Sequence, residues 1–238
     1  MFKQILCQIF SNQCQLTSLQ LDIANLSYEI HQSLNSPDYL SSNKISNESQ
    51  SYCITLRRLF IHLEYACFLE HLIEYVPNLE QLSIHFRNSL IDKYRLDSNI
   101  QIPKLSNGNW FNKPFHYLRK SALNTVRYAE FGISSCNVGE NDSIQIGKYL
   151  VPFLNTYMPY LQTLRLWRPD DFPWTSNEHV IVFEQDLCQL VEQLKQFVYL
   201  DIYGKIDPEK VEPYHLMVQT RFPNSRNDIQ ISRFSLWI

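Results

Sequence analysis

Glycine is scarce in this chain, and dense runs of one charge and long apolar stretches are missing. The 238 residues include only five glycines and match none of the glycine-rich nucleotide fingerprints, which excludes the common phosphate-binding loops. The net charge is −3 and the pI is about 6.2, without a dense Lys/Arg run, so we expect neither nucleic acid nor a membrane surface as partner. The longest apolar runs, such as KYLVPFLNTYM, are too short to cross a bilayer.

Signatures of catalysis and metal binding are also missing. The chain contains neither GxSxG nor HExxH, and its six cysteines show no CxxC spacing. We therefore expect no enzyme activity, no cofactor and no metal site. The N-terminal stretch MFKQILCQIFSNQCQ is amphipathic and lacks the continuous apolar block of a signal peptide. Reduced thiols in a cytoplasmic or nuclear protein are the expectation.

A short pattern recurs along the chain. VPNLEQLSIHF at 76–86 and MPYLQTLRLWR at 158–168 both fit L-x-x-L-x-L, and its final alternation is strand spacing. Five copies place apolar residues in the three slots: Leu16, Leu19 and Leu21; Leu56, Leu59 and Ile61; Leu79, Leu82 and Ile84; Leu161, Leu164 and Leu166; Phe197, Leu200 and Ile202.

Apolar residues at helical spacing precede several copies, and Pro77 and Pro159 follow such stripes directly. The repeating unit is therefore predicted to be helix, turn, strand. The long gap between the third and fourth copies predicts a degenerate copy at 123–131, with Leu123, Val126 and Tyr128 in its slots. A last strand is predicted in NDIQISRF, 227–234, through Ile229 and Ile231.

Polar stretches interrupt the repeats. SLNSPDYLSSNKISNESQS at 33–51 is rich in Ser and Asn, which is typical of a loop. Further insertions are expected near 88–115 and 132–144. We expect one domain over 1–238 with these three insertions, and an α/β fold class.

The segments LTSLQLDI, LRRLFIHL, LEQLSIHF and LQTLRLWR resemble the strand segments of leucine-rich repeats. From Phe2 to about Ile231, the succession of helix, proline and L-x-x-L resembles the irregular repeats of F-box-type leucine-rich-repeat proteins. The resemblance implies a horseshoe-shaped solenoid of about six to seven irregular repeats, with a parallel concave sheet and outer helices. It also implies a protein partner.

The F-box is a separate helical module that precedes the repeats in that family. Here the first repeat helix is expected to start at Phe2, which leaves no room for an F-box. The resemblance therefore implies the substrate-recognition half of an F-box-like adaptor, in the ubiquitin pathway. We do not expect this chain alone to dock a ubiquitin ligase.

Side chains that flank the inner leucines alternate to the opposite face of the expected sheet. Several of them are aromatic residues or Arg, the residue types that anchor protein interfaces. Ordinary strand residues would fit the same positions. We predict a partner-binding surface made of Phe60, His62, His85, Arg165, Trp167 and Tyr203.

His62 and His85 occupy equivalent positions in successive copies. If their strands are neighbours in a parallel sheet, the two residues lie about 5 Å apart. A zinc site needs three or four ligands, so we interpret the pair as stacked residues and not as a metal site.

Two alternatives to an interaction module stay open. One is an enzyme whose site is built from the insertion loops, which would gather titratable groups in a cleft. The other is a truncated repeat fragment without activity, which would expose an apolar end at residues 2–10.

Overall fold

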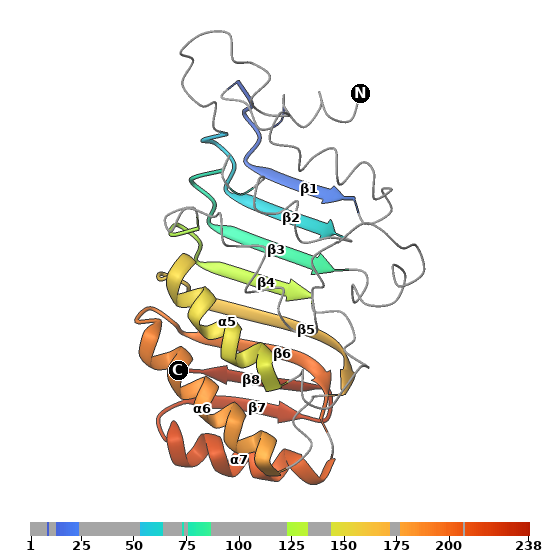
Figure 1. Cartoon of the computed structure of the whole chain (residues 1–238), viewed down its shortest axis with the longest axis vertical. Helices are drawn as coiled ribbons and strands as arrows, with labels where there is room; N and C mark the ends of the chain where they lie inside the picture. The colour runs from blue at the N-terminus through green and yellow to red at the C-terminus, as the bar shows by residue number, and fades with distance from the viewer. Residues whose placement is uncertain are drawn as a thin grey trace, which may run out of the picture.

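Eight strands form one open sheet in the part of the chain that the computed structural model describes (Figure 1). The described residues are 9, 13–23, 53–63, 73, 76–86, 123–132, 144–171, 177–206 and 208–238. The strands are β1 (Ser18–Asp22), β2 (Arg58–Leu63), β3 (Gln81–Phe86), β4 (Tyr128–Gly132), β5 (Thr163–Asp171), β6 (Tyr199–Lys205), β7 (Arg226–Gln230) and β8 (Arg233–Trp237). Their spatial order is β1-β2-β3-β4-β5-β6-β8-β7.

The repeated apolar slots set the register of the parallel part of the sheet. Leu59 pairs with Leu82, and Leu164 pairs with Leu200, each the second slot of its copy. The inward residues of β2, β3 and β6 are buried in one continuous apolar core. Alternation within each strand therefore places every second side chain in this core and leaves the others on the opposite face.

The turn before a strand is tied to the preceding copy by a recurring side chain. Thr55 donates its hydroxyl hydrogen bond to the carbonyl oxygens of Cys14 and Leu16, at 2.9 and 3.0 Å. At the equivalent positions, Asn78 donates to the Ile54 carbonyl and Thr125 to the carbonyls of Pro77 and Leu79. A polar residue directly before the first slot therefore links successive copies.

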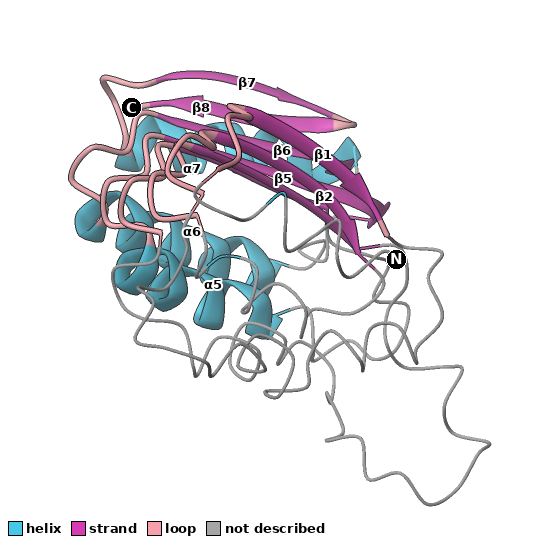
Figure 2. Cartoon of the chain, turned by 90° about the horizontal axis from the view of Figure 1, so that it is seen from above, coloured by secondary structure: helices cyan, strands magenta, loops and turns pink. Residues whose placement is uncertain are grey.

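Three described helices lie on one side of the sheet, as Figure 2 shows, along its C-terminal strands (Figure 1). They are α5 (Ile144–Tyr157), α6 (Asn177–Gln193) and α7 (Pro208–Arg221). Phe183 of α6 packs edge-on against Tyr214 of α7 and Phe234 of β8, with ring centroids 5.6 and 5.1 Å apart. The aromatic contacts join the last two helices to the C-terminal strands.

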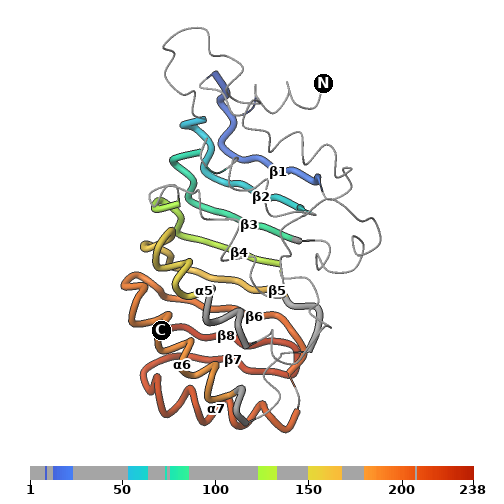
Figure 3. The backbone as a smooth tube through the Cα atoms, in the orientation of Figure 1, coloured from blue at the N-terminus to red at the C-terminus, as the bar shows by residue number. Residues whose placement is uncertain are grey.

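The sheet is not parallel throughout, which corrects the sequence prediction. Residues 226–237 form an antiparallel hairpin, and its second strand, β8, lies between β6 and β7 (Figure 3). Ile229 is buried in β7 as predicted, but Ile231 lies in the turn and is exposed. The hairpin forms because Phe234 and Leu236 alternate inward just after that turn.

The degenerate copy at 123–131 contains a strand, but its predicted register is wrong by three residues. Ala129 pairs with Leu82, and Phe131 pairs with Ile84, so these two residues fill the second and third slots. Val126 takes the first slot, and Tyr128 points to the opposite face, where its hydroxyl hydrogen-bonds to Glu130. Because the Ala129 side chain is small, the apolar pattern of the sequence did not show that Ala129 fills the second slot.

The predicted insertions fall almost entirely outside the described residues. This holds for 33–51, for 88–115 and for 133–143, the span between β4 and α5. The α/β class is confirmed, while the horseshoe curvature of the resembling family stays a prediction.

Candidate protein-binding face

Within the described part of the chain, no helix lies on the face of the sheet opposite α5, α6 and α7, which is called the helix-free face here. Its side chains form three rows across the strands. The first row is Ser18, Arg58, Gln81, Tyr128, Thr163, Tyr199, Trp237 and Arg226. The central row is Gln20, Phe60, Ser83, Glu130, Arg165, Asp201, Ser235 and Asp228. The third row is Asp22, His62, His85, Gly132, Trp167, Tyr203, Arg233 and Gln230.

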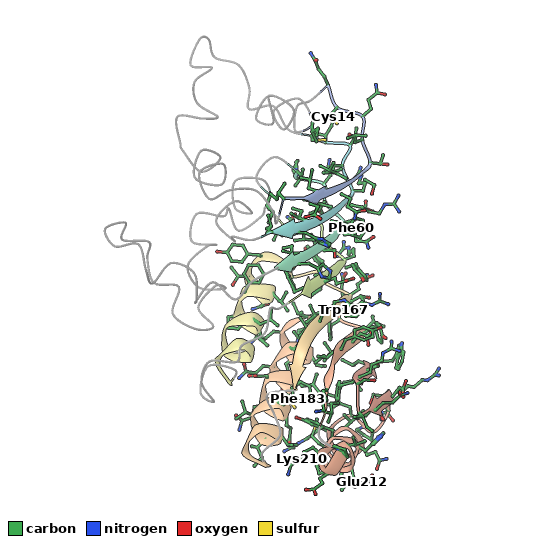
Figure 4. The ribbon with its side chains drawn as sticks, turned by 90° about the vertical axis from the view of Figure 1, so that its right-hand side faces the viewer. Cys14, Phe60, Trp167, Phe183, Lys210 and Glu212 are labelled. Atoms are coloured by element: carbon green, nitrogen blue, oxygen red, sulfur yellow. The ribbon has the colours of Figure 1, made fainter. Side chains whose placement is uncertain are left out.

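All six residues predicted for the binding surface lie on this face. They are Phe60, His62, His85, Arg165, Trp167 and Tyr203. Trp167 is 39% exposed, and Figure 4 shows Phe60 and Trp167 on the side of the sheet away from α5 and α6. The predicted phase of β2, β3, β5 and β6 is therefore confirmed, whereas binding by these residues stays a prediction.

Glu130 lies at the centre of the face and accepts three hydrogen bonds. Its Oε1 accepts from Trp167 Nε1 at 2.8 Å and lies 3.1 Å from His85 Nε2, while its Oε2 accepts from the Tyr128 hydroxyl at 2.6 Å. The contact with His85, opposed by burial and reinforced by Tyr128 and Trp167, lowers the pKa of Glu130 from 4.5 to about 2. Burial and the neighbouring carboxylate raise the pKa of Tyr128. Glu130 is therefore an ionised centre that fixes side chains from three strands.

Gly132 makes this arrangement sterically feasible. It pairs with His85 on one side and Trp167 on the other. A Cβ atom at Gly132 would lie 2.6 Å from His85 Nδ1 and 2.9 Å from its Cγ. The missing side chain thus leaves room for the imidazole ring to lean over Gly132 and reach Glu130.

A second buried carboxylate, Asp201, organises the C-terminal half of the face. Its side chain is fully buried and accepts hydrogen bonds from Arg233 Nε and Nη2, at 2.8 and 3.0 Å, and from the Ser235 hydroxyl at 2.8 Å. Burial opposes ionisation, but these hydrogen bonds hold the pKa of Asp201 below its usual range. Arg165 approaches the same carboxylate, with Nε 3.5 Å from Oδ2.

Aromatic rings stack across neighbouring strands. Trp167 and Tyr203 lie 4.1 Å apart at an interplanar angle of 8°, and the Arg233 guanidinium lies 5.1 Å from the Tyr203 ring centroid. In the first row, Tyr199 stacks on Trp237 at 4.7 Å. The contacts hold large side chains in fixed positions, which lowers the entropy lost when a partner binds.

His62 and His85 are paired in the sheet, and their ring centroids lie 5.2 Å apart, close to the predicted spacing. His62 Nδ1 lies 3.9 Å from Asp22 Oδ2, whereas His85 turns toward Glu130. Among the described residues, no group of three or more His, Cys, Asp or Glu side chains is placed to hold a metal ion.

Sequence reasoning missed the two carboxylates that organise the face. Glu130 was hidden by the wrong register at 123–131, and Asp201 was aligned correctly but not singled out. Arg233 was missed because the C-terminal hairpin was read as one parallel strand. The available signal was an acidic residue between two inward apolar residues, as in AEF and LDI.

Comparison with protein-family models finds no match to this chain, and comparison with curated proteins finds none either. None of the helices in the described part of the chain combines the length and the apolarity that a bilayer crossing requires.

Proposed function

We propose that this chain is a non-catalytic protein-interaction module that binds a protein partner on its helix-free face. The proposal includes an irregular leucine-rich-repeat solenoid as the scaffold and a cytoplasmic or nuclear location. It extends to substrate recognition of the kind seen in F-box-like adaptors, without ligase docking by this chain alone.

The observation that carries the proposal is the packing of Trp167 on Tyr203 next to Arg165. Trp, Tyr and Arg dominate the binding energy of protein interfaces. Here they stand on an open sheet face, with Trp167 held by Tyr203 and by its hydrogen bond to Glu130. A surface fixed in this way loses little side-chain entropy on binding.

The ionic contacts of the face favour a protein over nucleic acid. A nucleic-acid surface concentrates Lys and Arg with few opposing acids. On this face, Arg233 is paired with Asp201, and Arg165 lies next to the same carboxylate. An electrostatically balanced face with aromatic anchors suits a protein surface better.

The test is affinity capture from matched cell extract with two variants. The face variant carries Phe60→Ala, Arg165→Ala and Trp167→Ala. The control carries Ile181→Ala, Lys195→Ala and Leu216→Ala, which removes two exposed apolar side chains and one exposed cation on or near the helices. Circular dichroism and urea unfolding first establish that both variants fold.

The proposal predicts a protein that the wild-type chain and the control retain and that the face variant loses. Equal retention by the face variant would contradict it. So would selective loss in the control, because binding would then involve the helical side.

A further inference from the structure

The carboxylates in the middle of the helix-free face already have hydrogen-bond partners within the chain. Glu130 is only 15% exposed and accepts from Tyr128 and Trp167 beside its contact with His85. Asp201 is fully buried under Arg233 and Ser235. A partner's Lys or Arg therefore finds no accessible carboxylate in the central row between β2 and β6.

Arg165 differs, because its hydrogen-bonding capacity is incompletely used. Its Nε is buried without a hydrogen-bond partner, 3.5 Å from Asp201 Oδ2. The side chain as a whole is 36% exposed, so a partner can reach it at atoms other than the buried Nε. The guanidinium is held 5.6 Å from the Tyr128 ring centroid. A positioned guanidinium fork matches the geometry of a carboxylate.

The charges around Arg165 favour a ligand with one negative charge. The two guanidinium groups of Arg165 and Arg233 are balanced by the two carboxylates of Glu130 and Asp201. A phosphate dianion would be repelled by both carboxylates, and a nucleic-acid backbone would bring a further negative charge with every phosphate. A single carboxylate that reaches the partly exposed Arg165 side chain meets less repulsion.

The spacing of the central row suggests where a second anchor binds. Phe60 and Arg165 are separated by three strand spacings, about 14 Å. Between them lie Ser83, which is buried, and Glu130, which is nearly covered. An extended chain advances about 3.4 Å per residue, so about four residues span this separation. Side chains four apart in an extended segment point to the same side.

We propose that the partner docks through an extended segment that crosses the strands and carries one acidic residue and one large apolar residue. An Asp or Glu of this segment pairs with Arg165, and a large apolar side chain about four residues away covers Phe60. This inference rests on the proposed function and names the chemistry of the partner.

The experiment selects short random peptides on the full chain from a display library and measures the affinity of the enriched peptides by fluorescence anisotropy. We expect an acidic residue four positions from Phe, Trp, Leu, Ile or Met. Binding should weaken at least about tenfold in Arg165→Gln, and to a similar extent in Phe60→Ala. The double variant Ile181→Ala/Leu216→Ala should bind like the wild type.

A coupling measurement separates direct contact from a structural effect of the substitution. Changing the peptide's acid to its amide should weaken binding about tenfold to the wild type but not further to Arg165→Gln. Asp201 keeps Arg233 and Ser235 in this variant, so we expect it to fold. Arg165→Lys, which keeps the charge without the fork, should recover only part of the affinity.

Three results would overturn the inference: the enriched peptides contain no acidic residue, the acidic residue stands at another spacing from the apolar one, or the amide change weakens binding equally to the wild type and to Arg165→Gln. Tight binding of a labelled oligothymidylate that depends on Arg165 would indicate nucleic acid instead. If no peptide is enriched, the extended segment is wrong, while the capture experiment still decides the proposed function by itself.

Discussion

Replacing Glu130 by Gln should destabilise the folded chain by about 2–3 kcal/mol at neutral pH. The carboxylate accepts hydrogen bonds from Trp167 and Tyr128 and contacts His85. Hydrogen bonds to a charged group contribute about 1.5–3 kcal/mol, and Gln keeps the size of the side chain while losing its charge and one acceptor oxygen.

The pKa shift of Glu130 gives a second value for this free energy of stabilisation. It falls from 4.5 to about 2 on folding. At about 1.4 kcal/mol per pKa unit, this shift corresponds to about 3 kcal/mol. Because the side chain keeps 15% exposure, solvent screening makes that figure an upper bound.

The sign of the pH dependence follows from the lowered pKa. Glu130 stabilises the fold fully above pH 4.5, and this stabilisation is lost as the pH falls toward 2. Urea unfolding of the wild type and Glu130→Gln should therefore show a stability difference that shrinks by more than half between about pH 7 and about pH 3.

A matched control is Glu80→Gln, since Glu80 forms an exposed ion pair with Arg57. It should cost less than about 1 kcal/mol. The reasoning is refuted if Glu130→Gln costs no more than this control at neutral pH, or if its cost is the same at both pH values.

Three further substitutions test the packing by urea unfolding. Gly132→Ala should cost about 1–3 kcal/mol, because the new Cβ would lie 2.6 Å from His85 Nδ1; an unchanged midpoint would contradict the close approach. Leu82→Ala in the centre of the sheet should cost about 2–5 kcal/mol, since the side chain is fully buried; a cost below about 1 kcal/mol would be inconsistent with its core position. Trp167→Ala should cost about 2–4 kcal/mol through the lost stack on Tyr203 and the lost hydrogen bond to the Glu130 carboxylate; a cost below about 1 kcal/mol would show that neither contact stabilises the fold.

The strands that carry strong apolar slots were predictable from the sequence. Leu59, Leu82, Leu164 and Leu200 each occupy the second slot, and the sheet pairs them as the alignment requires. The reason is local: alternation with bulky apolar residues fixes which side of a strand faces the core.

The degenerate copy was placed correctly but read in the wrong phase. Tyr128 looked like an apolar slot, whereas Ala129 is the residue that the core accepts there. A small side chain gives a weak periodic signal, so only the pairing with β3 and β5 resolves the register. The C-terminal hairpin was missed for a similar reason, since the Ile231 turn interrupts an apolar alternation.

The contacts of the site depend on distant pairing. Glu130 receives a hydrogen bond from Trp167, 37 residues later in the chain, and Asp201 receives one from Arg233, 32 residues later. No sequence pattern relates such residues, and they meet only once the order and register of the strands are known. The predicted binding-surface residues could be placed on this face from the sequence, because strand phase alone determines their face.

The most direct test of the binding face is site-specific photo-crosslinking in cells. A photoreactive phenylalanine analogue replaces Phe60 in one version of the chain and Ile181, on α6, in another. The account predicts that a partner protein is crosslinked from position 60 and not from position 181. Crosslinking of a partner from position 181 alone would contradict the helix-free face as the binding surface.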